Sequence, residues 1–191
     1  MKKISQSPLV LFEPYIEALQ HSYPHIATCR DQIFKHESAC SGKGNSCFRI
    51  IEKSSNKAPK NICHICMDEL IPDSGQGEKK CDGVFIVLEE SQPSSDLQGQ
   101  AKYFCFGELK KGSNFDKAYE QIVATIKAFK AAFEHRHLAK EIDMPKKKIW
   151  GVIGGGAPAT GTNFQKQQAD FKKHHGQDLL KSRNNGDVAL G

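Results

Sequence analysis

Two carboxylates and an amine stand at the ends of two apolar segments of this sequence. Asp82 comes directly before the apolar run 83–88, and Glu108 and Lys110 follow the run 101–106. Residues two apart in a strand point to the same face, so Glu108 and Lys110 are expected to lie side by side. Charged groups at the end of an apolar strand are costly to bury without a partner or a task. If the two segments pair as strands, Asp82 lies near Glu108.

A pair of carboxylates of this kind suits a hard divalent cation. Mg²⁺ prefers oxygen ligands and keeps several waters, so Asp82 and Glu108 could supply two ligands and the carbonyl of Leu109 a third. Bound Mg²⁺ or Mn²⁺ would polarise a phosphate and lower the pKa of a water, while Lys110 orients that water or offsets transition-state charge. The structural alternative is that Asp82 caps a turn and that Glu108 and Lys110 form an ion pair at a strand end.

The elements around these residues predict a single α/β domain. Apolar spacing predicts helices at 9–19, 22–38, 115–137 and 164–174. Short apolar runs predict strands at 47–51, 83–88, 101–110 and 149–153. The strand–helix–strand step through 115–137 predicts a parallel crossover, and the earlier steps predict antiparallel pairing. The expected result is a mixed sheet with helices on both faces.

Composition places this domain among soluble globular proteins. The chain has 191 residues, which suits one domain over 1–191, and a Cys- and Lys-rich insertion is expected at about 52–80 and a polar, frayed C-terminal tail from about 181. No apolar run approaches the roughly 20 residues that span a bilayer, and the apolar patch at 9–12 is too short for a signal sequence, so we expect a cytoplasmic protein without membrane contact. Residues 101–191 carry 16 Lys and Arg against 9 Asp and Glu, which favours a polyanionic partner or else a solvated lysine-rich surface.

The order helix–strand–strand–strand–helix–strand, with Asp82 opening one strand and Glu108-Leu109-Lys110 closing the next, resembles the PD-(D/E)XK nuclease superfamily. This is the restriction-endonuclease-like fold, and the resemblance covers about residues 24–154. It implies Mg²⁺- or Mn²⁺-dependent hydrolysis of phosphodiester bonds, with nucleic acid, above all DNA, as the partner, and it is compatible with a homodimer. One departure is that Cys81, and not proline, precedes Asp82.

The same resemblance suggests two further site residues. Gln121, in the helix after the Glu-x-Lys strand, is expected to face the active site, and Glu37, with Glu17 behind it, is the candidate for an additional acidic residue from the first core helix. Lys117, one turn before Gln121 on the same side, is expected to contact phosphate. Lys111 is a second departure from the pattern, because it leaves open which lysine acts, and it is also a candidate for contact with nucleic acid.

Seven cysteines in a chain without a secretion signal are expected to be thiols or metal ligands. Cys63-His64-Ile65-Cys66 has the spacing of half a zinc site, which Cys40 and Cys47, or Cys81, could complete. An iron–sulfur cluster, which some nucleases of the superfamily carry, is an alternative occupant. Buried free cysteines are the other alternative.

Three functions therefore follow from the sequence. The first is a metal-dependent nuclease that acts on DNA in restriction, repair, recombination or mobile-element defence. The second is a non-catalytic module on the same fold, zinc-stabilised, that binds nucleic acid or protein. The third is a redox-responsive protein that acts through Cys63 and Cys66.

Overall fold

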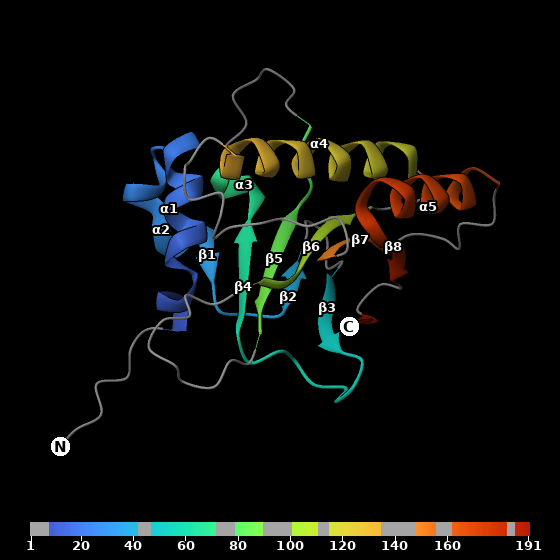
Figure 1. Cartoon of the computed structure of the whole chain (residues 1–191), viewed down its shortest axis with the longest axis horizontal. Coiled ribbons are helices and arrows are strands. Elements are labelled where there is room, and N and C mark those ends of the chain that lie inside the picture. The colour runs from blue at the N-terminus through green and yellow to red at the C-terminus, as the bar shows by residue number, and fades with distance from the viewer. Residues whose placement is uncertain are drawn as a thin grey trace.

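The computed structural model describes residues 8–41, 47–71, 79–89, 101–110, 115–134, 148–155, 162–182 and 186–191. Within these ranges the strands form a six-stranded sheet with the order β1-β4-β5-β6-β7-β8 and a three-stranded sheet with the order β2-β3-β9 (Figure 1). The strands are β1 (Phe34–Lys35), β2 (Ala39–Ser41), β3 (Cys47–Glu52), β4 (Ile62–Cys66), β5 (Gly83–Leu88), β6 (Ala101–Leu109), β7 (Ile149–Gly154), β8 (Gly176–Ser182) and β9 (Gly186–Leu190). The helices are the 3-10 helix η1 (Pro8–Phe12), α1 (Glu13–Ser22), α2 (Ile26–Ile33), α3 (Met67–Leu70), α4 (Phe115–Glu134) and α5 (Thr162–His175).

The six-stranded sheet is mixed. Its strands β1, β4, β5 and β6 pair antiparallel in turn, whereas β7 pairs parallel to β6 and β8 pairs parallel to β7. The parallel step from β6 to β7 runs through α4, as a crossover between parallel strands requires. The predicted mixed α/β fold, with a mixed sheet flanked by helices, is confirmed (Figure 1).

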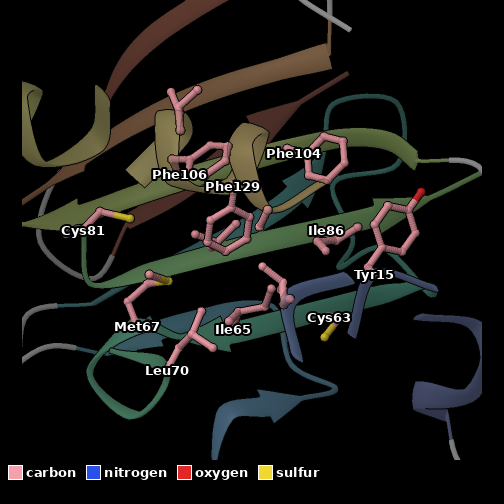
Figure 2. Close-up of a cluster of buried hydrophobic side chains, with 14 of the residues drawn as sticks. Tyr15, Cys63, Ile65, Met67, Leu70, Cys81, Ile86, Phe104, Phe106 and Phe129 are labelled. Carbon is pink, nitrogen blue, oxygen red and sulfur yellow. The ribbon is translucent and has the colours of Figure 1, made fainter. Parts of the chain in front are cut away.

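The two faces of this sheet are covered by different layers. On the helix face, side chains of β4, β5 and β6 pack against α1 and α4, as Phe106 and Phe129 do with ring centroids 5.5 Å apart (Figure 2). On the opposite face the three-stranded sheet packs, and the ring of Phe48 from β3 lies 5.8 Å from that of Phe85 from β5. We call these the helix face and the small-sheet face. A layer of strands thus takes the place of the helices that were expected on the second face.

The long helix α4 has the predicted apolar stripe. Ile122, Ile126, Phe129 and Phe133 are buried in the core of the helix face, at steps of three and four residues. Phe115, at the start of the helix, is half-buried against the same core. No helix in the parts of the chain that the structure describes combines the length and the apolar character needed to cross a membrane.

The expected insertion over 52–80 contains a strand of the main sheet. Residues Ile62–Cys66 form β4, which pairs with β1 on one side and β5 on the other. The prediction of a loop is wrong here because all five residues are wholly or largely buried, so the segment lacks the polar–apolar alternation of a half-exposed strand. The strand expected at 47–51 does form, as β3, but it lies in the three-stranded sheet.

Two other boundaries differ from the prediction. The helix expected to reach Ser38 ends at Ile33, after which Phe34–Lys35 pair with β4. The expected polar tail from 181 is wrong, because β8 runs to Ser182 and Gly186–Leu190 form β9, which pairs parallel to β3. Val188 and Leu190 are buried there against the small-sheet face, and this burial holds the end of the chain in place.

Candidate functional site

Asp82 and Glu108 meet at the edge of the sheet where β5 begins and β6 ends. Gly83, the first residue of β5, pairs with Gly107, so Asp82 stands just before this pair on one chain segment and Glu108 just after it on β6. The N–H of Asp82 donates to the carbonyl of Gly107 at 3.0 Å, and the Asp82 carboxylate is close enough to Glu108 to raise its pKa. A hydrogen bond of 2.5 Å from the Leu109 N–H to Oδ2 of Asp82 fixes the aspartate against the end of β6. The structure therefore brings the two predicted carboxylates together.

Glu108 is the most deeply buried member of this acidic pair. Glu108 is 1% exposed, and its Oε2 has no hydrogen-bond partner among the described residues. The other oxygen, Oε1, pairs with the Nζ of Lys110. Burial and the neighbouring Asp82 carboxylate raise the pKa of Glu108 to about 7, although the Lys110 ammonium and the backbone N–H of Asp82 oppose the shift. Glu108 can thus hold or release a proton near neutral pH.

Asp82 and Lys110 occupy the more open side of the site. Burial raises the pKa of Asp82, while the Leu109 N–H and the Lys110 ammonium act in the opposite direction. The backbone N–H of Lys110 donates to the carbonyl of Gly154 at the end of β7, at 2.9 Å, which anchors the lysine where three strands end. The Lys110 side chain is one-fifth exposed, and its amine pairs with Glu108.

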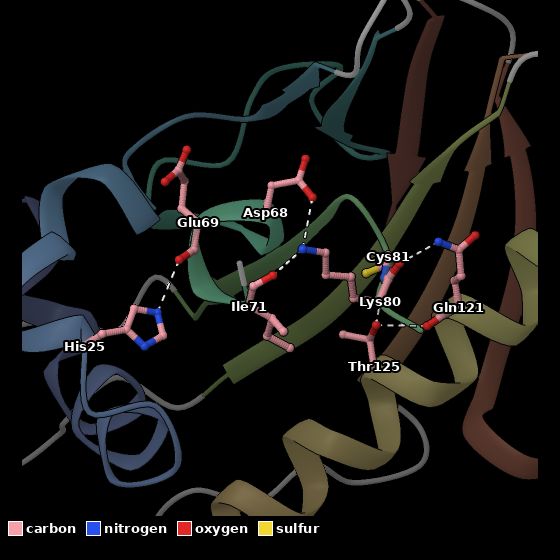
Figure 3. A network of polar contacts seen from close by, with 8 residues as sticks. All are labelled: His25, Asp68, Glu69, Ile71, Lys80, Cys81, Gln121 and Thr125. Carbon is pink, nitrogen blue, oxygen red and sulfur yellow. Dashed lines mark hydrogen bonds and ion pairs between the residues drawn. The ribbon is translucent and has the colours of Figure 1, made fainter. Parts of the chain in front are cut away.

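Gln121 reaches the segment that carries Asp82. Its Nε2 donates to the carbonyl of Lys80 at 2.8 Å, and its Oε1 is buried without a partner in the part of the chain that the structure describes (Figure 3). One turn later, the hydroxyl of Thr125 accepts from the N–H of Cys81 at 2.9 Å. Gln121 was predicted from the sequence, whereas Thr125 was not, although it stands four residues after Gln121 on the same side of the helix.

The remaining predicted site residues lie elsewhere. Glu37 does not join the acidic pair, because it follows β1 instead of ending a helix and its Oε1 bonds the Nδ1 of His64 at 2.8 Å. His64 stacks on Phe85, which places this contact on the small-sheet face. Lys117 lies on an exposed part of α4. Lys111 is outside the described residues.

The predicted cysteine ligands are divided between the two faces of the main sheet. Cys63 is buried on the helix face and Cys40 on the small-sheet face, while Cys66, three residues after Cys63 in the same strand, points away from it. Burial raises the pKa of the Cys63 thiol to about 12 and that of Cys40 further. Cys47 pairs with Ser41 in the three-stranded sheet. These four cysteines cannot share one ion in this arrangement.

No group of three or more His, Cys, Asp and Glu side chains within the described ranges is placed to hold a metal ion. The acidic pair is a set of two carboxylates, with the Leu109 carbonyl as a backbone oxygen next to them. Such a set suits Mg²⁺, which is bound by one or two carboxylates and keeps several waters, better than it suits a metal that needs a full protein cage.

Comparisons with models of protein families, with curated proteins and with solved structures find no match to this chain. The class of the protein therefore rests on the geometry of the site. That geometry is an acidic pair in which one buried oxygen has no partner within the described part of the chain, an adjacent amine, and a glutamine from the covering helix.

Proposed function

We propose that the chain is a metal-dependent nuclease of the PD-(D/E)XK type that hydrolyses phosphodiester bonds, with DNA as its substrate. The order of elements supports this proposal. Helix α2 is followed by β1, β2 and β3; then β4, β5 and β6 pair antiparallel, and α4 leads to the parallel strand β7. Asp82 opens the second of these strands and Glu108-Leu109-Lys110 closes the third, as in the superfamily pattern. The first strand of the set is β4, in place of the strand expected at 47–51.

The observation that carries the proposal is Oε2 of Glu108, near Asp82, which has no hydrogen-bond partner among the residues that the structure describes. A buried carboxylate oxygen without a donor is unfavourable unless something else satisfies it. A divalent cation held by Asp82 and Glu108, with the Leu109 carbonyl, would satisfy this oxygen and compensate the repulsion between the two carboxylates. When bound, Mg²⁺ or Mn²⁺ supplies Lewis-acid polarisation of the phosphate and lowers the pKa of a water.

The protein's own groups then have distinct roles in the proposed reaction. The Leu109 N–H keeps the Asp82 carboxylate directed at the end of β6. Lys110, one-fifth exposed, is placed to contact a phosphate oxygen and to stabilise the negative charge that develops during the displacement. Glu108, with a pKa of about 7, ionises in the range where the enzyme would act.

Cleavage assays with site variants test this proposal. Supercoiled plasmid, linear duplex, single-stranded DNA and RNA would be incubated with the protein and Mg²⁺, Mn²⁺ or EDTA. We expect metal-dependent cleavage of DNA, reduced by about 10²–10³-fold in Asp82→Asn, Glu108→Gln and Lys110→Met, as for the loss of a charge-stabilising group in other enzymes. The matched control is Lys102→Met, which breaks the 2.8 Å ion pair of Lys102 with Glu52 in the half of β6 away from the site.

Two results would contradict the proposal. If the wild-type protein cleaves none of these substrates with either metal, the chain is not such a nuclease, and binding of DNA without cleavage would favour the non-catalytic module. If cleavage occurs but survives in Asp82→Asn and Glu108→Gln, the activity does not come from this site.

A further inference from the structure

Helix α4 holds a single peptide group just before Asp82 by both of its polar atoms. The carbonyl of Lys80 and the N–H of Cys81 belong to the same peptide unit. Gln121 Nε2 donates to that carbonyl at 2.8 Å, and Thr125 Oγ1 accepts from that N–H at 2.9 Å (Figure 3). Two side chains one helical turn apart therefore fix the plane of one peptide. We call this arrangement the peptide clamp.

The hydroxyl of Thr125 has its direction set by the helix. Thr125 Oγ1 donates its own proton to the carbonyl of Gln121 at 2.9 Å, which leaves a lone pair for the N–H of Cys81. Thr125 is 2% exposed and Cys81 is 1% exposed, so bulk water cannot replace this contact. A buried N–H that loses its acceptor would be unsatisfied, so the clamp has a strong preference for one peptide orientation.

The clamp completes the set of backbone contacts around Asp82. The N–H of Asp82 donates to the carbonyl of Gly107 at 3.0 Å, and its carbonyl accepts from the N–H of Met67 at 3.2 Å. These contacts come from β6 and from the start of α3, whereas the preceding peptide is held by α4. The direction in which the Asp82 side chain leaves the backbone is thus determined from both sides.

We propose that Thr125, through the peptide clamp, is a positioning residue that sets the metal affinity of Asp82. This inference rests on the proposed function. Residues that orient a metal ligand without touching the metal commonly change affinity or activity by about 10–100-fold. The clamp also depends on a residue other than proline at position 81, because proline has no N–H to donate. The departure from the superfamily pattern at Cys81 and the acceptor on Thr125 are therefore complementary.

Metal binding to three threonine variants tests the inference. Thr125→Val keeps the shape of the side chain and removes both hydrogen bonds, while Thr125→Ser keeps the hydroxyl. Thr28→Val is the matched control, because Thr28 also donates to a backbone carbonyl, that of His25 at 2.9 Å, but lies exposed on α2. Mn²⁺ affinity would be measured by titration calorimetry, and cleavage would be measured at low and at saturating Mn²⁺.

We expect Thr125→Val to weaken Mn²⁺ binding by about 10–100-fold. The cleavage it loses at low Mn²⁺ should return largely at saturating Mn²⁺. Thr125→Ser should bind Mn²⁺ nearly as well as the wild type, because it keeps the hydroxyl that forms the clamp. Thr28→Val should also bind like the wild type, because it lies outside the clamp. If Thr125→Val does not fold, Gln121→Met removes the other half of the clamp and should weaken binding in the same way.

The outcomes separate the two proposals. Wild-type binding of Mn²⁺ with unchanged affinity in the folded clamp variants overturns the positioning role and leaves the nuclease proposal intact. Absence of Mn²⁺ binding to the wild type overturns the metal-dependent site and the positioning role with it. An equal loss of affinity in Thr125→Val and Thr28→Val would also overturn the role, since it would show that the effect is not specific to the clamp.

Discussion

Replacing Glu108 by glutamine should stabilise the protein while it removes the proposed activity. Glu108 is 1% exposed, and burial together with the Asp82 carboxylate raises its pKa from 4.5 to about 7. At pH 8 the wild-type protein must ionise this group in the folded state, where its charge is unfavourable. Glutamine has nearly the same shape and can still accept from Lys110, but it carries no charge. The variant is therefore expected to unfold less readily than the wild type in the absence of metal.

The size and the pH range follow from the shift in pKa. Between pH 4.5 and pH 7 the carboxyl group ionises in the unfolded chain while it stays protonated in the folded protein. The contribution of Glu108 to stability is thus most favourable below pH 4.5, falls between pH 4.5 and about 7, and is constant above that range. The total loss is about 3 kcal/mol at roughly 1.4 kcal/mol for each pKa unit. For a protein of this size, that difference corresponds to a rise in Tm of roughly 6–12 °C for Glu108→Gln at pH 8.

Thermal and urea unfolding of both proteins at pH 5 and pH 8, in EDTA, measures the difference. The gain should be large at pH 8 and fall to about 0.8 kcal/mol at pH 5. Added Mg²⁺ should raise the Tm of the wild type more than that of the variant, because a ligand stabilises the state that binds it. Lys110→Met is the control for loss of the ion pair and should not stabilise. If Glu108→Gln is no more stable than the wild type at pH 8, Glu108 does not carry an unfavourable charge and the account of the site is wrong.

Three further predictions concern the small-sheet face and are measured by urea unfolding. Gly107→Ala would place a Cβ on the ring of Phe48 and should cost about 1–3 kcal/mol, part of which Phe48→Leu should recover. Burial lowers the pKa of His64, so stability should decrease as the pH falls below about 6.5, and this decrease should be smaller in His64→Gln. Removing residues 186–191 should cost about 3–6 kcal/mol, because Val188 and Leu190 lose their burial. An unchanged midpoint in the truncated chain, equal acid sensitivity with and without His64, or a neutral Gly107→Ala would contradict these predictions.

The carboxylate pair could be predicted from the sequence because local patterns contain it. Each of the two strands corresponds to a short apolar run in the sequence, and two such runs linked by a polar segment favour a hairpin. A slip of one residue would turn the buried side chains to the other face, which restricts the register, and the observed register brings the start of β5 beside the end of β6, next to Asp82 and Glu108. The helix α4 was equally visible from its apolar stripe.

The parts that could not be predicted depend on contacts distant in sequence. β4 is buried between β1 and β5, so its residues show no alternation, and its cysteines and histidine resemble metal ligands instead of strand interior. The residues of β9 have the composition of a polar tail, and they form a strand because they pair with β3, which is distant in the sequence. Glu37 was expected to join the acidic pair, but the chain turns into β1 before it, and it meets His64 instead. Nothing local in the sequence distinguishes these outcomes.

The small sheet has a part in the site although it carries none of the charged groups. Glycines stand next to both carboxylates and at the end of β7, and other side chains occupy the space where their Cβ atoms would be. A Cβ at Gly83 would lie 2.6 Å from Nε2 of His64. A Cβ at Gly107 would meet the ring of Phe48, and one at Gly154 would lie 3.0 Å from the same ring. On the small-sheet face, side chains of β3 and β4 therefore pack against the strand ends next to Asp82 and Glu108. On the helix face, α4 binds the segment before Asp82. Because β9 keeps β3 in place, loss of residues 186–191 should weaken Mn²⁺ binding even under conditions in which the shortened chain stays folded, and unchanged affinity would show that the helix face alone positions the carboxylates.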